Sequence, residues 1–154
     1  MRERILNDLK IAMKNQDKET LKVIRMVKGS MQLEEIKLKH ELTDDEVIGI
    51  ISKEIKIRKE SIVEFTKGNR DDLISEAARE IEILEKYLPE QLTDLEVDSV
   101  IDDAFKKINP TSIKDMGKVM GMVTPLLKGK TDLSLVSAKI KDKLSNWFYA
   151  FFLI

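Results

Sequence analysis

The residues with the most evident chemistry are glycines and lysines in the last third of the chain. Segment 115–121 (DMGKVMG) places Gly117 and Gly121 one helical turn apart. A glycine inside a helix costs about 1 kcal/mol relative to alanine, so two of them indicate that another backbone must approach closely. A packed neighbouring helix is the commoner explanation, and a nucleic-acid backbone is the more specific one. The turn 128–130 (KGK) adds two cations beside a third glycine.

Lysines surround these glycines, and they are the candidate nucleic-acid contacts. Ammonium groups neutralise phosphates, and such binding weakens as salt is added. Lysine also covers helices that bind nothing, so residue type alone leaves both interpretations open. No aromatic residue accompanies them between residues 112 and 146, which argues against base stacking. The candidates are Lys114, Lys118, Lys128, Lys130, Lys139 and Lys143, with Gly117, Gly121 and Gly129 as the close-approach glycines.

A second set of basic residues lies in the first half of the chain. Its members are either a further phosphate-binding face or ion-pair partners of the acidic helix predicted over 70–88. Exposed ion pairs of that kind contribute about 0–1 kcal/mol. The set consists of Arg25, Lys28, Lys56, Arg58, Lys59 and Arg70.

No combination of residues predicts catalysis or metal binding. The chain has no cysteine, one histidine (His40) and no HExxH motif. Glu76 and Glu80 lie one turn apart, but solvated helices often carry such pairs. Because no Ser–His pair or phosphate-binding glycine loop is present, we predict no catalytic residue, no metal and no cofactor. We expect His40 to have a surface or capping role.

Helical periodicity dominates the chain and predicts an all-α, multihelical fold. Apolar stripes predict a short N-terminal helix and helices over 18–39, 44–67 and 70–88. Pro89 ends the fourth helix, because its ring cannot continue the hydrogen-bond ladder. Three shorter helices follow. The expected domains are a four-helix bundle over 1–89 and a small three-helix bundle over 90–146.

Several residues mark the ends of these helices. Thr-x-x-Glu capping boxes begin at Thr43 and Thr93, and Asn69 and Ser112 are further N-cap candidates. Gly129 lies in the turn before the last helix. The helix before that turn is expected to bury the stripe Ile113, Met116, Met120, Val123 and Leu127.

Charge is unevenly distributed along the 154 residues, although the net charge is −1. Residues 1–39 carry 10 basic and 6 acidic side chains, and residues 71–103 carry 2 basic and 12 acidic ones. Residues 112–146 carry 7 basic and 3 acidic side chains. This asymmetry indicates a polyanionic partner for the last third, or an acidic surface that is merely solvated.

The N-terminus predicts where the protein is located, and the C-terminal residues stand apart from the helical pattern. The N-terminus is charged and has no long apolar run, so we expect no signal peptide, no membrane span and a cytosolic location. Residues 147–154 (WFYAFFLI) hold five of the eight aromatic residues and are too few to cross a bilayer. We interpret them as a non-native or disordered tail, with a partner or membrane-surface anchor as the alternative.

Residues 1–146 resemble the bacterial YqeY proteins of the GatB/YqeY type. The chain departs from that pattern at Asp132, which is followed by Leu133 where the family often has glycine, and in the aromatic tail. The matching pieces are 21–28 (LKVIRMVK), 56–61 (KIRKES), 70–73, 80–89 (EIEILEKYLP), 115–121 and 128–130.

The resemblance implies an all-helical fold and a link to tRNA. A related module forms the tail of the B subunit of the tRNA-dependent amidotransferase, where it contacts tRNA, and similar modules are appended to some glutaminyl-tRNA synthetases. We therefore expect a tRNA-binding accessory protein, with amidotransferase or synthetase components as further partners. One alternative is a subunit or helper in carbon–nitrogen ligation with glutamine as the amido-N donor, although we expect no activity from this chain alone. Another is a helical protein-interaction module that uses the acidic residues of 70–88.

Overall fold

The protein is helical throughout the part of the chain that the structure describes. This computed structural model describes the backbone of residues 1–152 and the side chains of residues 1–146. The elements over these residues are helices, without a β-strand, so the predicted all-α fold is confirmed. The chain divides into two compact units, Met1–Pro89 and Glu90–Ile154, and each has its own apolar core.

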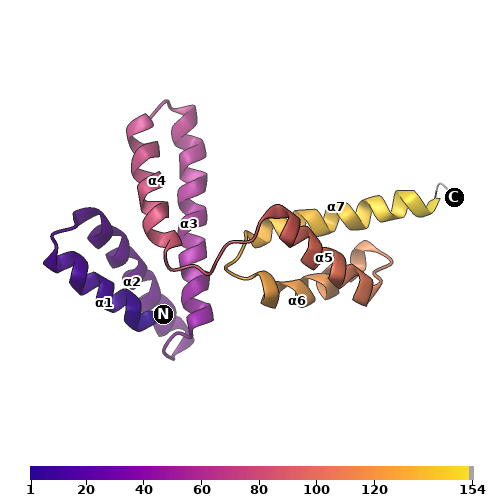
Figure 1. Cartoon of the computed structure of the whole chain (residues 1–154), viewed down its shortest axis with the longest axis horizontal. Coiled ribbons are helices and arrows are strands. Elements are labelled where there is room, and N and C mark those ends of the chain that lie inside the picture. The colour runs from indigo at the N-terminus through magenta and orange to yellow at the C-terminus, as the bar shows by residue number, and fades with distance from the viewer. Residues whose placement is uncertain (153–154) are drawn as a thin grey trace. The chain divides into compact units, whose positions relative to one another are not determined.

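The first unit consists of two helical hairpins. Helix α1 (Arg2–Lys14) pairs with α2 (Lys18–Leu38), and α3 (Asp44–Lys67) pairs with α4 (Asp71–Glu85), as Figure 1 shows. Each helix contributes an apolar stripe to one shared core, because burying these side chains removes them from water. Buried members of this core include Ile5, Val23, Ile24, Val27, Met31, Val47, Ile51, Ile55, Ile81 and Leu84.

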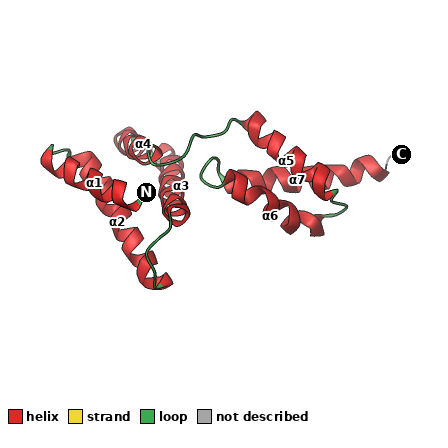
Figure 2. Ribbon diagram, turned by 60° about the horizontal axis from the view of Figure 1, so that its bottom comes forward, coloured by secondary structure: helices red, strands yellow, loops and turns green. Residues whose placement is uncertain are grey.

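The second unit consists of three α-helices and one turn of 3₁₀-helix. They are α5 (Asp94–Ile108), the 3₁₀-helix η1 (Ile113–Asp115), α6 (Met116–Leu127) and α7 (Leu133–Phe152). Helix α6 packs against both α5 and α7 (Figure 2). The core contains Val97, Ile101, Phe105, Val119, Val123, Leu127, Val136, Ile140 and Leu144.

Most of the predicted helix starts are confirmed. Thr43 and Thr93 each form a capping box with the glutamate three residues later, and the Ser112 hydroxyl accepts a hydrogen bond from the Lys114 N–H at 3.3 Å. Asn69 is a wrong N-cap prediction. It has a φ of 52°, in the left-handed region, and Arg70 occupies the cap position of α4. Asparagine tolerates this conformation, so Asn69 serves the turn that leaves α3.

The predicted apolar stripe of α6 is partly wrong. Val119, which the stripe omitted, is buried, whereas Met116 and Met120 are only half-buried at the edge of the core. Ile113 is 49% exposed. It lies in η1, where three residues make a turn instead of 3.6, so its phase does not continue into α6.

The end of α7 also differs from expectation. We expected the last helix to stop near residue 146, but its backbone continues to Phe152. The described residues do not include the side chains of 147–152 or any part of 153–154. The interpretation of 147–154 as a non-native or disordered tail falls on these residues and stays a prediction.

Gly129 shapes the turn between α6 and α7. Its φ is 76°, a conformation that favours glycine, and it is buried. The turn is tied to the start of this unit, because the Gln91 side chain donates to the Gly129 carbonyl at 2.6 Å and the Leu92 N–H donates to the Lys130 carbonyl at 2.9 Å. The positions of Lys128 and Lys130 are therefore set by this glycine.

Gly129→Ala is expected to lower the free energy of unfolding by about 1–2 kcal/mol, because alanine is strained in the left-handed conformation. Gly121→Ala is the matched control. It is expected to raise stability by up to about 1 kcal/mol, since alanine favours the helix and no atom lies within 4 Å of the added Cβ. Urea unfolding followed by circular dichroism measures both changes, and a stabilising Gly129→Ala would contradict this account.

Candidate nucleic-acid interface

The two glycines of α6 lie on its solvent-exposed face. Both are exposed, and a Cβ added at Gly117 or Gly121 meets no atom of the described chain within 4 Å. A packed neighbouring helix of this chain therefore does not explain them. Their use in a close approach to another molecule stays a prediction.

Three of the candidate lysines lie beside this face without a carboxylate partner in the described part of the chain. Lys114 is exposed in η1, just before α6, Lys128 is exposed at the end of α6, and Lys130 is half-buried just beyond. The length of α6, at a rise of 1.5 Å per residue, separates Lys114 from Lys128 by roughly 20 Å. These cations are available to an external anion.

Lys118 makes one surface ion pair. Its ammonium lies 3.0 Å from the Asp115 carboxylate, and the lysine side chain is 72% exposed. Asp115 also accepts hydrogen bonds from the backbone N–H groups of Thr111 at 3.0 Å and Ser112 at 3.4 Å, so this carboxylate closes the turn before α6. An exposed pair of this kind is weak and leaves Lys118 able to reach another anion.

The last two candidate lysines bind carboxylates of α5. The Lys139 ammonium lies 2.8 Å from Asp98 and 3.9 Å from Asp94, and the hydrogen bond to Asp98 raises the pKa of Lys139. Lys143 pairs with Asp102, and its ammonium lies 5.1 Å from the centre of the Phe105 ring. Lys139 and Lys143 thus fasten α7 to α5 and are less available to a ligand than the lysines around α6.

The turn that Asp115 closes is expected to weaken in acid. Hydrogen bonds from the Thr111 N–H and the Lys118 ammonium hold the pKa of Asp115 at about 2, below the ordinary 3.8. The unfolded chain binds the proton more readily, so the contribution of Asp115 to stability is present above pH 4 and lost as the pH falls towards 2. Asp115→Asn should therefore lower the urea midpoint at pH 6, and the difference from wild type should shrink below pH 4. An equal difference at both pH values would contradict this.

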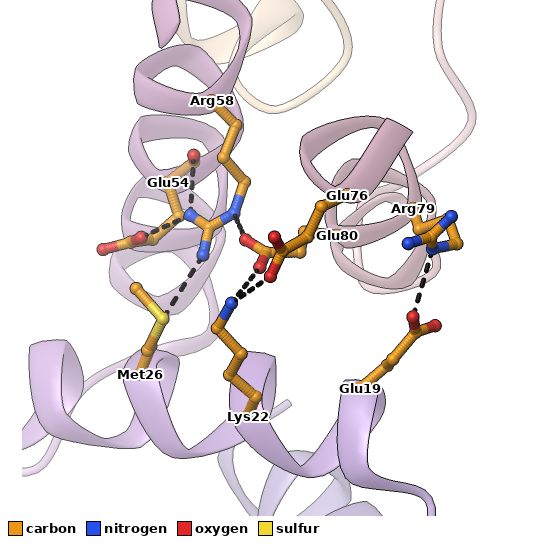
Figure 3. Close-up of polar contacts among 8 residues, drawn as sticks. All are labelled: Glu19, Lys22, Met26, Glu54, Arg58, Glu76, Arg79 and Glu80. Atoms are coloured by element: carbon orange, nitrogen blue, oxygen red, sulfur yellow. Dashed lines mark hydrogen bonds and ion pairs between the residues drawn. The ribbon is translucent and has the colours of Figure 1, made fainter. Parts of the chain in front are cut away.

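Arg58, a member of the second basic set, is buried and not part of a basic surface. Its guanidinium donates to Glu54 at 2.7 Å and to Glu80 of α4 at 2.7 Å, and it lies 3.6 Å from the sulfur of Met26 (Figure 3). Its side chain is 7% exposed, and both carboxylate side chains are 14% exposed. Arg58 is thus an ion-pair partner of the acidic helix, and it does not reach a phosphate.

Further ion pairs join α2 to α4. The Lys22 ammonium lies 2.5 Å from Glu76 and 2.9 Å from Glu80, and Arg79 of α4 lies 3.1 Å from Glu19 (Figure 3). The hydrogen bonds from Lys22 and Arg58 lower the pKa of Glu80 against the opposing effect of burial. Part of the acidic charge of α4 is therefore used inside the unit.

The other members of the second set lie at the surface. Arg70 pairs with Asp72 at 2.8 Å, and Lys56 is exposed. Arg25, Lys28 and Lys59 have no carboxylate partner among the described residues, and Arg25 and Lys59 are exposed. The structure thus separates this set into one buried ion-pair residue and several surface cations.

Arg58→Met is expected to lower the free energy of unfolding by about 3 kcal/mol, because two largely buried carboxylates lose their shared cation. Arg70→Met is the matched control and should leave stability nearly unchanged, since its ion pair is exposed on both sides. Equilibrium urea unfolding measures both. Equal effects of the two substitutions would contradict the structural role of Arg58.

Sequence reasoning missed the partners of Arg58. The spacing of Glu54 and Arg58 at i and i+4 was a usable signal within α3, but nothing in the sequence connects Arg58 to Glu80 or Lys22 to Glu76. It also missed the exposed aliphatic side chains of α2, Leu33 and Ile36.

The described residues contain no group of three or more His, Cys, Asp or Glu side chains placed to hold a metal ion. None of the described helices is long and apolar enough to span a bilayer. His40 is exposed, and its ring lies 2.7 Å from the Glu41 carbonyl and 3.5 Å from the Glu46 carboxylate.

These features define an all-helical protein of two units whose available charges near α6 are cationic. The family model of the Yqey-like proteins matches residues 2–144, and the chain belongs to this family. The chain is 30% identical over 142 residues to "Altered inheritance of mitochondria protein 41, mitochondrial" of Pyrenophora tritici-repentis, covering 90% of this chain and 78% of the relative. It is 29% identical over 149 residues to the protein of that name from Vanderwaltozyma polyspora, covering 92% and 80%.

A Saccharomyces cerevisiae protein of the same name is 35% identical over 102 residues, covering 66% of this chain and 54% of the relative. The names of these relatives contradict the cytosolic location that we expected, because they are mitochondrial proteins. A charged N-terminus without an apolar run was too weak a basis for that expectation.

Proposed function

We propose that this protein is a non-catalytic tRNA-binding accessory protein that uses the lysines around α6. The observation behind the proposal is the division of the lysines in the second unit. Lys139 and Lys143 are held by α5, whereas Lys114, Lys128 and Lys130 have no carboxylate partner in the described residues. Unpaired cations on one unit favour a polyanionic ligand.

The exposed face of α6 supports a nucleic-acid backbone as that ligand. Gly117 and Gly121 leave the helix surface without side chains, so a sugar–phosphate chain can lie close to the helix while lysines contact its phosphates. This arrangement contacts the backbone of the nucleic acid and not its bases. We therefore expect recognition that depends on shape and charge more than on sequence.

The choice of tRNA rests on the family. The chain belongs to the Yqey-like proteins, and the resemblance noted above includes a module that contacts tRNA in a tRNA-dependent amidotransferase. An association with tRNA-dependent amidation or aminoacylation follows from the same resemblance and is part of the proposal.

Lys118→Glu combined with Lys130→Glu is expected to weaken binding to total tRNA about tenfold or more at low salt, because two phosphate contacts become repulsive. The slope of log affinity against log salt should fall in magnitude by about 2. Fluorescence anisotropy with labelled tRNA at several salt concentrations measures both.

Lys53→Glu and Lys107→Glu together form the control, since they make the same charge change at exposed lysines of α3 and α5. They should weaken binding much less than the test pair. Undetectable binding of the wild-type protein at low salt would refute the proposal, and equal losses in both double variants would reduce it to non-specific charge attraction.

A further inference from the structure

The outward face of α2 carries apolar side chains that are largely or partly exposed. Leu33 and Ile36 are 71% and 74% exposed, and Met26 is 46% exposed. With Gly29 they form one stripe along the helix, which we call the α2 stripe: Met26, Gly29, Leu33 and Ile36. Side chains of this kind are normally buried against a partner when they occur as a set and not singly.

The spacing of the α2 stripe is that of a helix-packing seam. Its members follow one another at intervals of three, four and three residues, which is the alternation of a and d positions in a heptad. A second helix lying along α2 would meet Gly29, Leu33 and Ile36 on the same side, beside Met26, which contacts Arg58 of α3. An extended chain, with its period of two, would not.

The surface beside the stripe is hollowed. An open hollow of about 900 Å³ is lined by Gly29, Leu33 and Ile36 of α2. Basic residues and the carboxylates of Glu35 and Glu41 also line it, and Glu35 is paired with Arg2. A Cβ added at Gly29 meets no atom within 4 Å, so the floor of the hollow at this point is bare helix backbone. This allows a second helix to approach closely at the centre of the stripe.

The charges beside the stripe are mostly cations, with the carboxylate of Glu41 as an exception. Arg25, Lys28 and Lys39 have no carboxylate partner among the described residues, and Arg25 and Lys39 are exposed. Lys37, by contrast, lies 3.3 Å from Glu34. The uncompensated charge at this surface is therefore positive, which complements an acidic partner and repels a basic one.

The stripe is held in place by contacts that the same face of α2 makes one turn nearer its N-terminus. Lys22 is bound to Glu76 and Glu80 of α4, and Met26 contacts Arg58 of α3 (Figure 3). These contacts fix the rotation of α2 about its axis. The surface is thus preformed, which reduces the ordering cost of binding.

We propose that the α2 stripe is the docking surface for an acidic amphipathic helix of a partner protein. The apolar residues of that helix would pack on Leu33, Ile36 and Gly29, and its carboxylates would pair with Arg25, Lys28 and Lys39. An acidic helix is favoured over RNA, because the cations could bind phosphates but the exposed aliphatic side chains would gain nothing from them. This site is separate from the lysines around α6 and adds a protein partner to the proposed function.

The test uses the full chain and a synthetic helical peptide with leucine at a and d positions and glutamate at the flanking ones. A second peptide carries lysine in place of every glutamate. By fluorescence anisotropy at low salt, the acidic peptide should bind about tenfold or more tightly than the basic one. Leu33→Ser with Ile36→Ser should weaken the acidic peptide about tenfold or more. Arg25→Glu with Lys39→Glu should remove the preference for it.

Val63→Ser with Leu95→Ser is the control, because these side chains are 55% and 81% exposed on other helices. This variant should bind the acidic peptide as wild type does. All three double variants alter exposed residues, so circular dichroism and thermal unfolding should show intact folds.

Three results would overturn the proposal: the acidic peptide does not bind, both peptides bind equally, or binding is unchanged after Leu33→Ser with Ile36→Ser. If sedimentation equilibrium shows a dimer that this double variant abolishes, the occupant of the stripe is a second copy. If the variant loses tRNA and not the peptide, the surface belongs to RNA.

Discussion

Arg58 is the buried charged residue on which the arrangement of the first unit depends. A guanidinium removed from water is tolerated only where carboxylates surround it, and here α3 supplies Glu54 and α4 supplies Glu80. Lys22 of α2 shares Glu80. One connected set of charges therefore joins α2, α3 and α4 at the edge of an apolar core. Apolar stripes bury surface without requiring particular partners, whereas these ion pairs form only when the three helices lie as they do here.

The same principle separates structural from available cations in the second unit. Lys139 and Lys143 extend from α7 to carboxylates of α5 and stabilise the packing of those two helices. The lysines at the two ends of α6 have no such partners in the described residues, and the glycines between them leave its outer face bare. A net charge per segment hides this difference, because it counts a bound and an unbound lysine alike. The proposed tRNA contact rests on the unbound ones and on Lys118, whose ion pair with Asp115 is exposed and weak.

Exposed side chains that could bind a partner also occur on α2, but they are of different types from those around α6. Around α6 the surface is cationic and lacks side chains at Gly117 and Gly121, which suits a phosphate backbone, although Met122 and Leu126 of the same helix are also exposed. On α2 the surface combines exposed aliphatic residues with cations, which suits an amphipathic acidic helix. The two proposals therefore assign different kinds of partner to the two surfaces.

The sequence by itself determined the helices, their capping boxes at Thr43 and Thr93, and the all-α class, because helix periodicity and caps depend on residues within a few positions of one another. The match of the DMGKVMG and KGK motifs to the family could likewise be recognised, because each motif is a short continuous stretch of sequence. The stripe of α6 was predicted only in part: Val123 and Leu127 are buried, whereas Ile113 is exposed because it lies in the 3₁₀ turn, whose phase differs from that of α6. Only the tertiary structure decided which charges are paired. Glu80 lies 22 residues from Arg58, and Asp98 lies 41 residues from Lys139, so their contacts exist only once the helices have packed.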